Sequence, residues 1–149
     1  MRGLEQIPSL YDACMAFADW RGLRRWRRWL AAGARGRTLE IGCGTGRNLP
    51  LYGQPVSVVG IEPEWDALLA ARRKAPGVPL VQARAEALPF KPGVFDTVVS
   101  SLVFCSVSDV PGALGEIRRV LAPGGELRML EHVRARSRMG AWLQDRIQP

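Results

Sequence analysis

A glycine-rich segment with an acid before it is the part of this 149-residue sequence best suited to chemistry. It runs from Glu40 to Gly46 as E-I-G-C-G-T-G and follows a short apolar run that predicts a strand over 38–41. Glycines at the end of a strand let a ligand approach the backbone closely, and a following helix N-terminus attracts anionic groups. The third glycine stands one residue earlier than in a dinucleotide-binding G-x-G-x-x-G segment. Because Glu40 would repel a pyrophosphate and attract an ammonium group, the segment predicts a nucleoside ligand with a positive charge.

Two later segments extend this prediction. Glu62 ends the next predicted strand, 56–61, and lies 22 residues after Glu40, close to the spacing at which an acid accepts hydrogen bonds from both hydroxyls of a ribose. The segment Ala85–Phe90, A-E-A-L-P-F, follows a third predicted strand at 80–83 and can offer backbone groups and an acid to an adenine edge. S-adenosylmethionine has the ribose, the adenine and the positive charge, so the three segments predict it as the cofactor.

The elements that must position these residues alternate between strands and helices. Strands are expected at 38–41, 56–61, 80–83, 95–100 and 126–132, with a short helical stretch ending near Pro50. Helices are expected at 63–74 with Pro63 in the first turn, at 109–121 with Asp109 as the cap and Pro111 in the first turn, and at 138–147. This order predicts an α/β fold, a Rossmann-like, doubly wound and mainly parallel sheet, with the ligand at the carboxyl ends of the strands.

The chain before residue 35 is expected to form an N-terminal helical cap, 1–34, on a cofactor-binding domain, 35–149. Residues 9–33 read as two helices with a break near Gly22, and the second has an apolar stripe at Leu23, Trp26 and Leu30. Four arginines form a cationic stripe bordered by two tryptophans. They are Arg21, Arg24, Arg25 and Arg28, with Trp20 and Trp29 beside them. The stripe fits an anionic membrane surface, and a solvated helix face is the alternative.

Five motifs in order resemble the class I S-adenosylmethionine-dependent methyltransferases. They are Leu39–Gly46, Glu62-Pro63, Ala85–Phe90, Phe95–Ser100 and Arg119–Gly125. The stretches Leu102–Val107 and Met129–Val133 are similar to methyltransferase-like thiol methyltransferases, and Gly44–Tyr52 is similar to bacterial phosphatidylethanolamine N-methyltransferases. The resemblance implies methyl transfer to a thiol, amine or quinone-like acceptor, small molecule or lipid, with S-adenosylhomocysteine as the product.

The resemblance also implies a set of cofactor-binding residues. They are Tyr11, Glu40, Gly42, Cys43, Gly44, Gly46, Asn48, Glu62, Pro63, Ala85, Glu86, Ser101 and Leu102. Many relatives have an Asp before the Ala-Glu pair, where this chain has Arg84. His132, the only histidine, is the candidate general base; a polar strand end that only shapes the pocket is the alternative, since methyl transfer needs little beyond alignment and desolvation. Cys105 lies in an apolar run and is expected in the core.

Composition narrows the remaining function classes. The chain is 47% hydrophobic, has no apolar run long enough to span a membrane, and has no recognisable signal peptide. Its three cysteines lie far apart, which argues against a metal site or disulfides and for a reducing cytoplasm; we expect a cytoplasmic protein, peripheral to the membrane if the arginine stripe binds lipid. Of its basic groups, eight lie in residues 1–37 against three acids, and seven in residues 118–149 against three acids.

That basic charge raises the possibility of a nucleic-acid substrate. The expected strand 95–100 is followed by Ser101-Leu102 rather than an N-P-P-aromatic motif, and the chain has no Pro-Cys nucleophile, so nucleic acid is disfavoured as a partner and an RNA methyltransferase is only an alternative. The chain supplies about five of the seven strands usual in the fold that it resembles. With the last two strands missing, we expect a homodimer that pairs the open sheet edge, a truncated or fragmentary chain, or a cofactor-binding module without complete catalysis.

Overall fold

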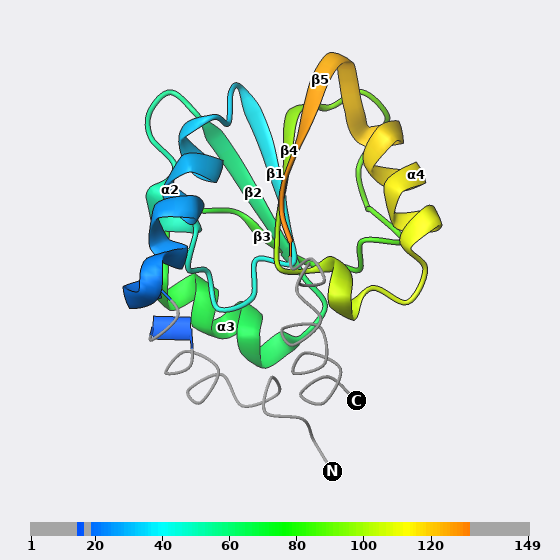
Figure 1. The fold of residues 1–149 in the computed structure, drawn as a ribbon. Coiled ribbons are helices and arrows are strands. Elements are labelled where there is room, and N and C mark those ends of the chain that lie inside the picture. The colour runs from blue at the N-terminus through cyan, green and yellow to red at the C-terminus, as the bar shows by residue number, and fades with distance from the viewer. Residues whose placement is uncertain (1–14, 17–18, 132–149) are drawn as a thin grey trace, which may run out of the picture.

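The computed structural model describes residues 15–16 and 19–131, and its elements follow the predicted alternation (Figure 1). In chain order they are η2 (Asp19–Leu23), α2 (Arg24–Ala32), β1 (Arg37–Ile41), η3 (Leu49–Leu51), β2 (Ser57–Glu62), α3 (Trp65–Lys74), β3 (Leu80–Gln82), β4 (Phe95–Ser101), η4 (Phe104–Ser106), α4 (Val110–Val120) and β5 (Leu121–Leu130). The five strands form one sheet in the order β3-β2-β1-β4-β5, and every described pairing is parallel. The predicted α/β doubly wound fold is therefore confirmed, with its switch point between β1 and β4.

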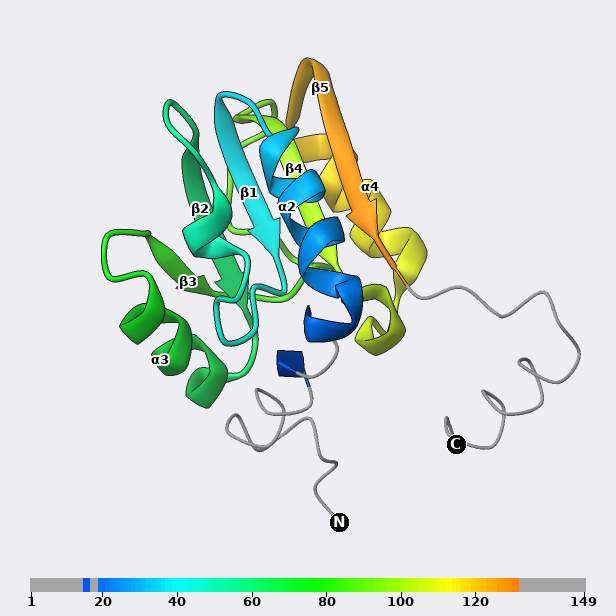
Figure 2. The ribbon, with the colours of Figure 1, turned by 60° about the vertical axis from the view of Figure 1, so that its left-hand side comes forward.

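Helices cover both faces of the sheet. Figures 1 and 2 show α2 and α3 on one face and α4 on the other. Side chains of a strand alternate between faces, so Leu39 and Ile41 of β1 enter the core below α4, while Thr38 and Glu40 point to the opposite face. Glu40 is in register with Gly60 of β2 and Val99 of β4, at the centre of the sheet. Alternation thus places the Glu40 carboxylate on the face of the sheet that α2 covers.

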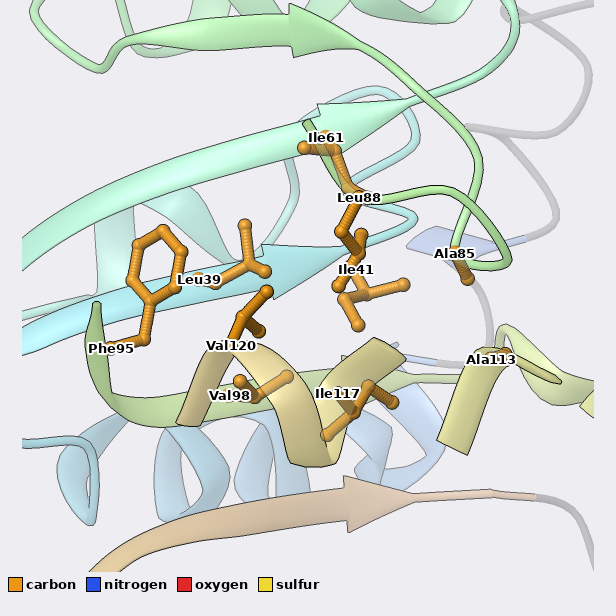
Figure 3. Packing of buried hydrophobic residues seen from close by; sticks show 10 residues of the cluster. All are labelled: Leu39, Ile41, Ile61, Ala85, Leu88, Phe95, Val98, Ala113, Ile117 and Val120. Atoms are coloured by element: carbon orange, nitrogen blue, oxygen red, sulfur yellow. The ribbon is translucent and has the colours of Figure 1, made fainter. Parts of the chain in front are cut away.

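The main core lies between the sheet and α4 (Figure 3). Helix α4 contributes Ala113, Ile117 and Val120 to this core, and each is at most 2% exposed. These pack on Leu39 and Val98 of the two central strands. Full burial of an aliphatic side chain contributes about 1.5–3 kcal/mol, so this layer holds the strands whose carboxyl ends form the candidate site.

Several local predictions are confirmed and several are wrong. Asp109 caps α4 by accepting a hydrogen bond from the N–H of Gly112 at 3.0 Å, as expected. Gly22 has a φ of 118°, which interrupts the helix where the break was predicted. Pro63, expected in the first turn of α3, precedes that helix, whose cap position is Glu64. Pro50 lies inside the 3₁₀ turn η3 rather than after a helical stretch.

The last strand also differs from its expected bounds. β5 begins directly after α4 and ends at Leu130, not at His132, and its pairing with β4 shifts register between Phe95 and Thr97. The expected helix 138–147 and residues 9–14 lie outside the described residues.

The surface beside β5 is apolar and hollowed. β5 lies at the end of the strand order. Leu114 of α4 and Met129 of β5 are 41% and 39% exposed. A hollow of about 630 Å³ lies between the two elements, lined mainly by apolar groups such as Leu121 and Leu127. Among the described helices, none combines the length and the apolar character needed to cross a membrane.

Candidate functional site

The glycine segment forms a tight loop at the carboxyl end of β1. Gly42, Gly44 and Gly46 have φ values of 58°, 53° and 79°, in the left-handed region that favours glycine. A Cβ at Gly46 would lie 2.9 Å from Cα of Ala71, so this glycine permits close packing of the loop on α3. A Cβ at Gly44 would meet no atom within 4 Å, because this glycine faces an open pocket.

That pocket has a volume of about 620 Å³ and lies where β1, β2 and β4 end. Eight of the predicted cofactor-binding residues line it. They are Gly42, Gly44, Glu62, Pro63, Ala85, Glu86, Ser101 and Leu102. Four others, Glu40, Cys43, Gly46 and Asn48, are not on its lining, and at least Glu40, Cys43 and Asn48 are buried. Tyr11 and His132 lie outside the described residues, so their predicted roles stay predictions.

Glu62 lies at the pocket wall and is tied to the glycine loop. Its Oε2 accepts a hydrogen bond from the N–H of Gly44 at 2.9 Å, and its Oε1 accepts one from the N–H of Glu64 at 3.1 Å. Burial raises the pKa of Glu62, and these two backbone bonds oppose the rise. Each carboxylate oxygen keeps a lone pair beyond its backbone bond, so the group can accept from two ligand hydroxyls.

Glu40 is a second acid, buried beneath the loop and 2% exposed. Its Oε1 accepts a hydrogen bond from Nδ2 of Asn48 at 2.9 Å. Burial raises the pKa of Glu40 to about 7, although Tyr52, Asn48 and the charge of Arg27 each pull it down. The other oxygen, Oε2, and the Tyr52 hydroxyl are buried without a hydrogen bond of ordinary length. A buried carboxylate whose neighbours favour its ionised form suits a cationic partner.

The segment Ala85–Phe90 borders the pocket beyond β3 and is held there by α4. Arg119 donates hydrogen bonds to the carbonyl oxygens of Phe90 at 2.7 Å and Leu88 at 2.9 Å. Glu116 accepts the N–H of Leu88 at 2.8 Å and pairs with Arg119. The arginine of the Arg119–Gly125 motif therefore positions the loop that the resemblance assigns to adenine.

Arg84, which stands where the family resemblance leads one to expect an acid, lines the pocket. Its Nη2 lies 3.4 Å from Oε1 of Glu86, which also accepts the N–H of Ser108 at 3.2 Å. The pKa of Glu86 is lowered, first by a hydrogen bond from its own backbone N–H and then by Arg84. Glu86 thus supplies an anionic group to this side of the pocket.

The loop after β4 closes the other side of the pocket. Leu102 has a φ of 60°, which is rare for a branched aliphatic residue and costs about 1–3 kcal/mol. Three hydrogen bonds hold the loop: the carbonyl of Leu130 accepts the N–H of Leu102 at 2.7 Å, and Glu131 accepts the N–H groups of Val103 at 3.1 Å and Phe104 at 3.3 Å. Glu131 is a functional residue that the sequence reasoning missed, although it stands next to His132.

Cys105 in the same loop corrects a prediction. It was expected in the core, but its thiol is exposed and the residue lines the pocket. Cys105 falls in the short 3₁₀ turn η4, and its neighbour Phe104, rather than Cys105 itself, packs against the core. Among the described residues, no cluster of three or more His, Cys, Asp or Glu could hold a metal ion.

Arg27 is the other functional residue that the sequence reasoning missed. It lies on the buried face of α2 with Leu30 and Ala31 and is 5% exposed. Trp26, expected in the apolar stripe, is instead 48% exposed beside Trp29. The signal was present, because Arg27 is spaced three and four residues from Leu30 and Ala31 and so shares their face.

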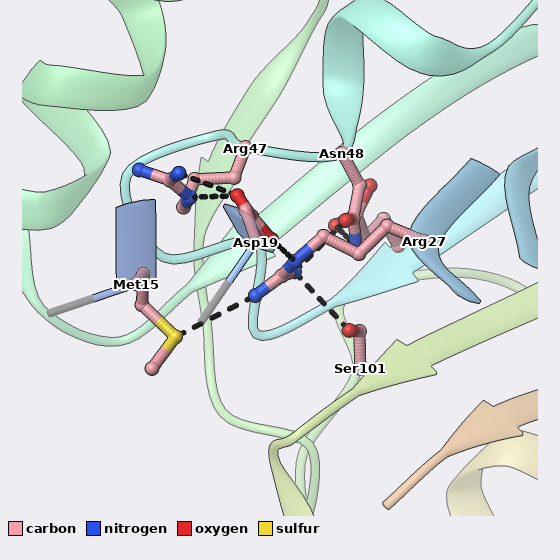
Figure 4. Close-up of polar contacts among 7 residues, drawn as sticks. Met15, Asp19, Arg27, Arg47, Asn48 and Ser101 are labelled. Atoms are coloured by element: carbon pink, nitrogen blue, oxygen red, sulfur yellow. Dashed lines mark hydrogen bonds and ion pairs between the residues drawn. The ribbon is translucent and has the colours of Figure 1, made fainter. Parts of the chain in front are cut away.

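The guanidinium of Arg27 joins four groups at the base of the site (Figure 4). Its Nε donates to Asp19 at 3.1 Å, its Nη1 to Oδ1 of Asn48 at 2.9 Å and to the hydroxyl of Ser101 at 3.3 Å, and its Nη2 to the sulfur of Met15 at 3.7 Å. Asp19 also pairs with Arg47 of the glycine loop. The segment before α2 is thereby tied to the loop and to β4.

Comparison with known proteins agrees with this geometry. Residues 39–129 match the methyltransferase domain family, and the chain belongs to that family. The match runs from β1 to β5 and therefore includes the glycine loop and the pocket acids Glu62 and Glu86.

Two curated proteins are similar to this chain over much of its length. The chain is 38% identical over 103 residues to a phosphatidylethanolamine N-methyltransferase of Cereibacter sphaeroides, covering 65% of this chain and 51% of that protein. It is 39% identical over 110 residues to the human thiol S-methyltransferase TMT1B, covering 68% and 45%. The resemblance stated from the motifs is confirmed by these matches.

A solved structure agrees as well. A Thermotoga maritima protein, described as an S-adenosylmethionine-dependent methyltransferase and possible histamine N-methyltransferase, superposes with a TM-score of 0.66 at 30% identity, covering 89% of this chain and 64% of that one. The chain spans about half the length of the two curated relatives named above.

Proposed function

We propose that this protein transfers a methyl group from S-adenosylmethionine to a thiol, amine or quinone-like acceptor, either a small molecule or a lipid. The observation that carries the proposal is the pocket at the strand ends. Its wall contains Gly44, a left-handed glycine at which an added Cβ would meet only open space. It also contains Glu62, whose carboxylate accepts a hydrogen bond from the glycine loop and borders the pocket. The relatives that act on a phospholipid amine and on thiols support this choice of acceptors.

The residues present fit this cofactor. Gly44 leaves room for a ligand against the backbone, and Glu62 would accept the two ribose hydroxyls. Ala85 and Glu86 would border adenine, and the charge of Glu40, which is buried behind the glycine loop, would attract the ammonium group. When bound, the cofactor supplies a methyl group on a positively charged sulfur, which the lone pair of an acceptor can take.

The chain's own contribution to such a transfer is alignment and exclusion of water. Leu102, Val103 and Val107 line the pocket beside the end of β4 and give that side an apolar surface. Glu131 holds this loop in its strained conformation, and Arg119 holds the opposite one. His132 remains the candidate base for an acceptor that must lose a proton.

The test is a transfer assay with tritiated-methyl cofactor against a panel of thiols, phospholipids, quinones and RNA, using the full-length protein. We expect label in a thiol, phospholipid or quinone and none in RNA. Labelled RNA alone would favour the RNA methyltransferase alternative. Tight binding of S-adenosylhomocysteine without transfer to any acceptor would favour a binding module, and absence of binding would refute the proposal.

We also propose that the outer surface of α2 docks on an anionic lipid surface. Trp20, Trp26 and Trp29 are 78%, 48% and 56% exposed. Arg25 lies 5.4 Å from the ring centre of Trp26, and Arg128 of β5 lies 4.8 Å from that of Trp29. The predicted stripe arginines, Arg21, Arg24, Arg25 and Arg28, are all exposed. Exposed tryptophans among arginines match the composition of interfacial helices.

Vesicle co-sedimentation tests this surface. Binding to phosphatidylglycerol vesicles should exceed binding to phosphatidylcholine vesicles and should fall with salt. Each basic residue contributes about 1 kcal/mol near an anionic surface, so reversing both Arg24 and Arg28 to Glu should weaken binding by several kcal/mol. The matched control reverses Arg72 and Arg73, which are exposed on α3. If both double variants lost the same amount of vesicle affinity, the net charge of the protein and not the surface of α2 would explain the binding. If the wild type did not bind anionic vesicles, docking would be refuted.

A homodimer is the third proposal. The apolar hollow between α4 and β5, together with the position of β5 at the end of the strand order, supports a second copy of the chain as the occupant.

A further inference from the structure

Asn48 stands between Arg27 and Glu40, and its orientation depends on the arginine. A guanidinium only donates hydrogen bonds, so Nη1 of Arg27 at 2.9 Å requires the carbonyl oxygen of Asn48 on its side. The amide nitrogen must then face Oε1 of Glu40, where it lies at 2.9 Å. Arg27 and Asn48 are 5% and 3% exposed, so water has little access to replace either contact. A chain of two buried hydrogen bonds thus connects α2 to the acid beneath the glycine loop.

The charges along this chain are arranged so that Glu40 can stay ionised. Asp19 accepts hydrogen bonds from both Arg27 and Arg47, so this one acid is shared between two guanidinium groups. Glu40 is the next acid along the chain, and the charge of Arg27 favours its ionised form. Without that charge, burial would keep Glu40 protonated, because an isolated carboxylate is costly away from water.

We propose that Arg27 is a positioning residue for the cofactor: it orients Asn48 and thereby keeps Glu40, buried behind the glycine loop, ionised so that its charge attracts the cofactor's ammonium group. The proposal rests on the proposed function, since it assumes that this pocket takes a ligand with an ammonium group. The hydrogen bond from Arg27 to Ser101 ties the same guanidinium to a residue of the pocket wall. Arg27 therefore acts through its neighbours and lines no part of the pocket itself.

A change in cofactor affinity between pH 6 and 9 would not come from the Cys43 thiol or the Tyr52 hydroxyl near Glu40. Burial raises the pKa of the Cys43 thiol and of the Tyr52 hydroxyl, and the charge of Glu40 raises both further, so both stay neutral between about pH 6 and 9. Glu62 also has a raised pKa. Glu62 and the ligand's own ammonium group titrate alike in wild type and variants, so a comparison between proteins isolates Glu40.

The experiment measures binding of S-adenosylhomocysteine by calorimetry from pH 6 to 9. It uses the wild type, Arg27→Met, Asn48→Asp and the control Arg28→Met, which removes the same charge from an exposed position of the same helix. Affinity should rise as Glu40 ionises, with a midpoint near pH 7 in the wild type. Arg27→Met should move this midpoint upward and weaken binding by about tenfold at neutral pH, since one pKa unit corresponds to a factor of ten.

The pattern across pH separates positioning from mere packing. At high pH the affinities of Arg27→Met and the wild type should converge, whereas loss of packing alone would weaken binding equally at every pH. Asn48→Asp keeps an acceptor for Arg27 but turns an oxygen toward Glu40, so it should also raise the midpoint. If thermal unfolding shows that Arg27→Met does not fold, the shift of the midpoint in Asn48→Asp tests the proposal instead.

Two results would overturn the inference, and they are distinguishable. If the wild type binds and both variants keep the midpoint of Arg28→Met, Arg27 does not position Glu40, while the proposed function stands. If the wild type binds no S-adenosylhomocysteine at any pH, the proposed function fails and this inference falls with it.

Discussion

Gly44 and Gly46 separate two tasks of the glycine loop, ligand access and packing on α3. Both have left-handed φ values, 53° and 79°, so alanine at either position costs about 1–2 kcal/mol in backbone strain. A Cβ at Gly46 would also lie 2.9 Å from Cα and 3.0 Å from Cβ of Ala71. A Cβ at Gly44 would contact nothing within 4 Å and would project into the pocket.

The two alanine variants should therefore fail in different ways. Overpacking a filled site costs a further 1–3 kcal/mol or so, so Gly46→Ala should lower the free energy of unfolding by about 2–5 kcal/mol and Gly44→Ala by about 1–2 kcal/mol. A ligand at about 100 times its Kd stabilises a protein by about 2.7 kcal/mol. Gly44→Ala should lose most of this ligand stabilisation, and Gly46→Ala should retain more of it.

Urea unfolding followed by tryptophan fluorescence, with and without S-adenosylhomocysteine, measures both quantities on the same samples. The wild type provides the reference for each. The reasoning would be refuted if Gly44→Ala lost more stability than Gly46→Ala without ligand, because the packing difference would then be absent. It would also be refuted if the ligand stabilised Gly44→Ala as much as the wild type.

Three further predictions follow from the site and the sheet edge. Glu62→Ala should weaken S-adenosylhomocysteine binding by about 1–3 kcal/mol in calorimetry, since two hydroxyls lose their acceptor; unchanged affinity would remove Glu62 from the site. Glu131→Ala leaves two backbone N–H groups without an acceptor and should lower the free energy of unfolding by about 1–3 kcal/mol, and Glu131→Gln should lose less; equal stability of all three proteins would show that other contacts hold the loop. Sedimentation at high micromolar concentration should show a dimer, and a stable monomer would contradict the pairing proposed at β5.

Features that depend on neighbouring residues were predictable from the sequence. The glycine loop follows β1 because a short apolar run and three glycines specify a strand and then a tight turn. Asp109 caps α4 through a group three residues away, and Gly22 breaks the helix through its own backbone freedom. Strand and helix alternation restricts the topology to a parallel sheet, so the meeting of Gly44 and Glu62 at one edge could be expected.

Features that depend on distant partners were decided only by tertiary structure. Arg27 reads as one more charge in an arginine-rich helix until Asn48, 21 residues away, and Ser101, 74 residues away, enclose it. The sequence pattern indicated His132 and not Glu131, because the role of Glu131 depends on a loop 27–28 residues earlier in the chain. Burial of a charge is favourable only when the packed structure supplies its partners, and these partners lie on other elements. The sequence alone therefore determined where the candidate pocket forms, and the packing of α2 on the sheet and the pairing of β5 with β4 determined which side chains hold its walls in place.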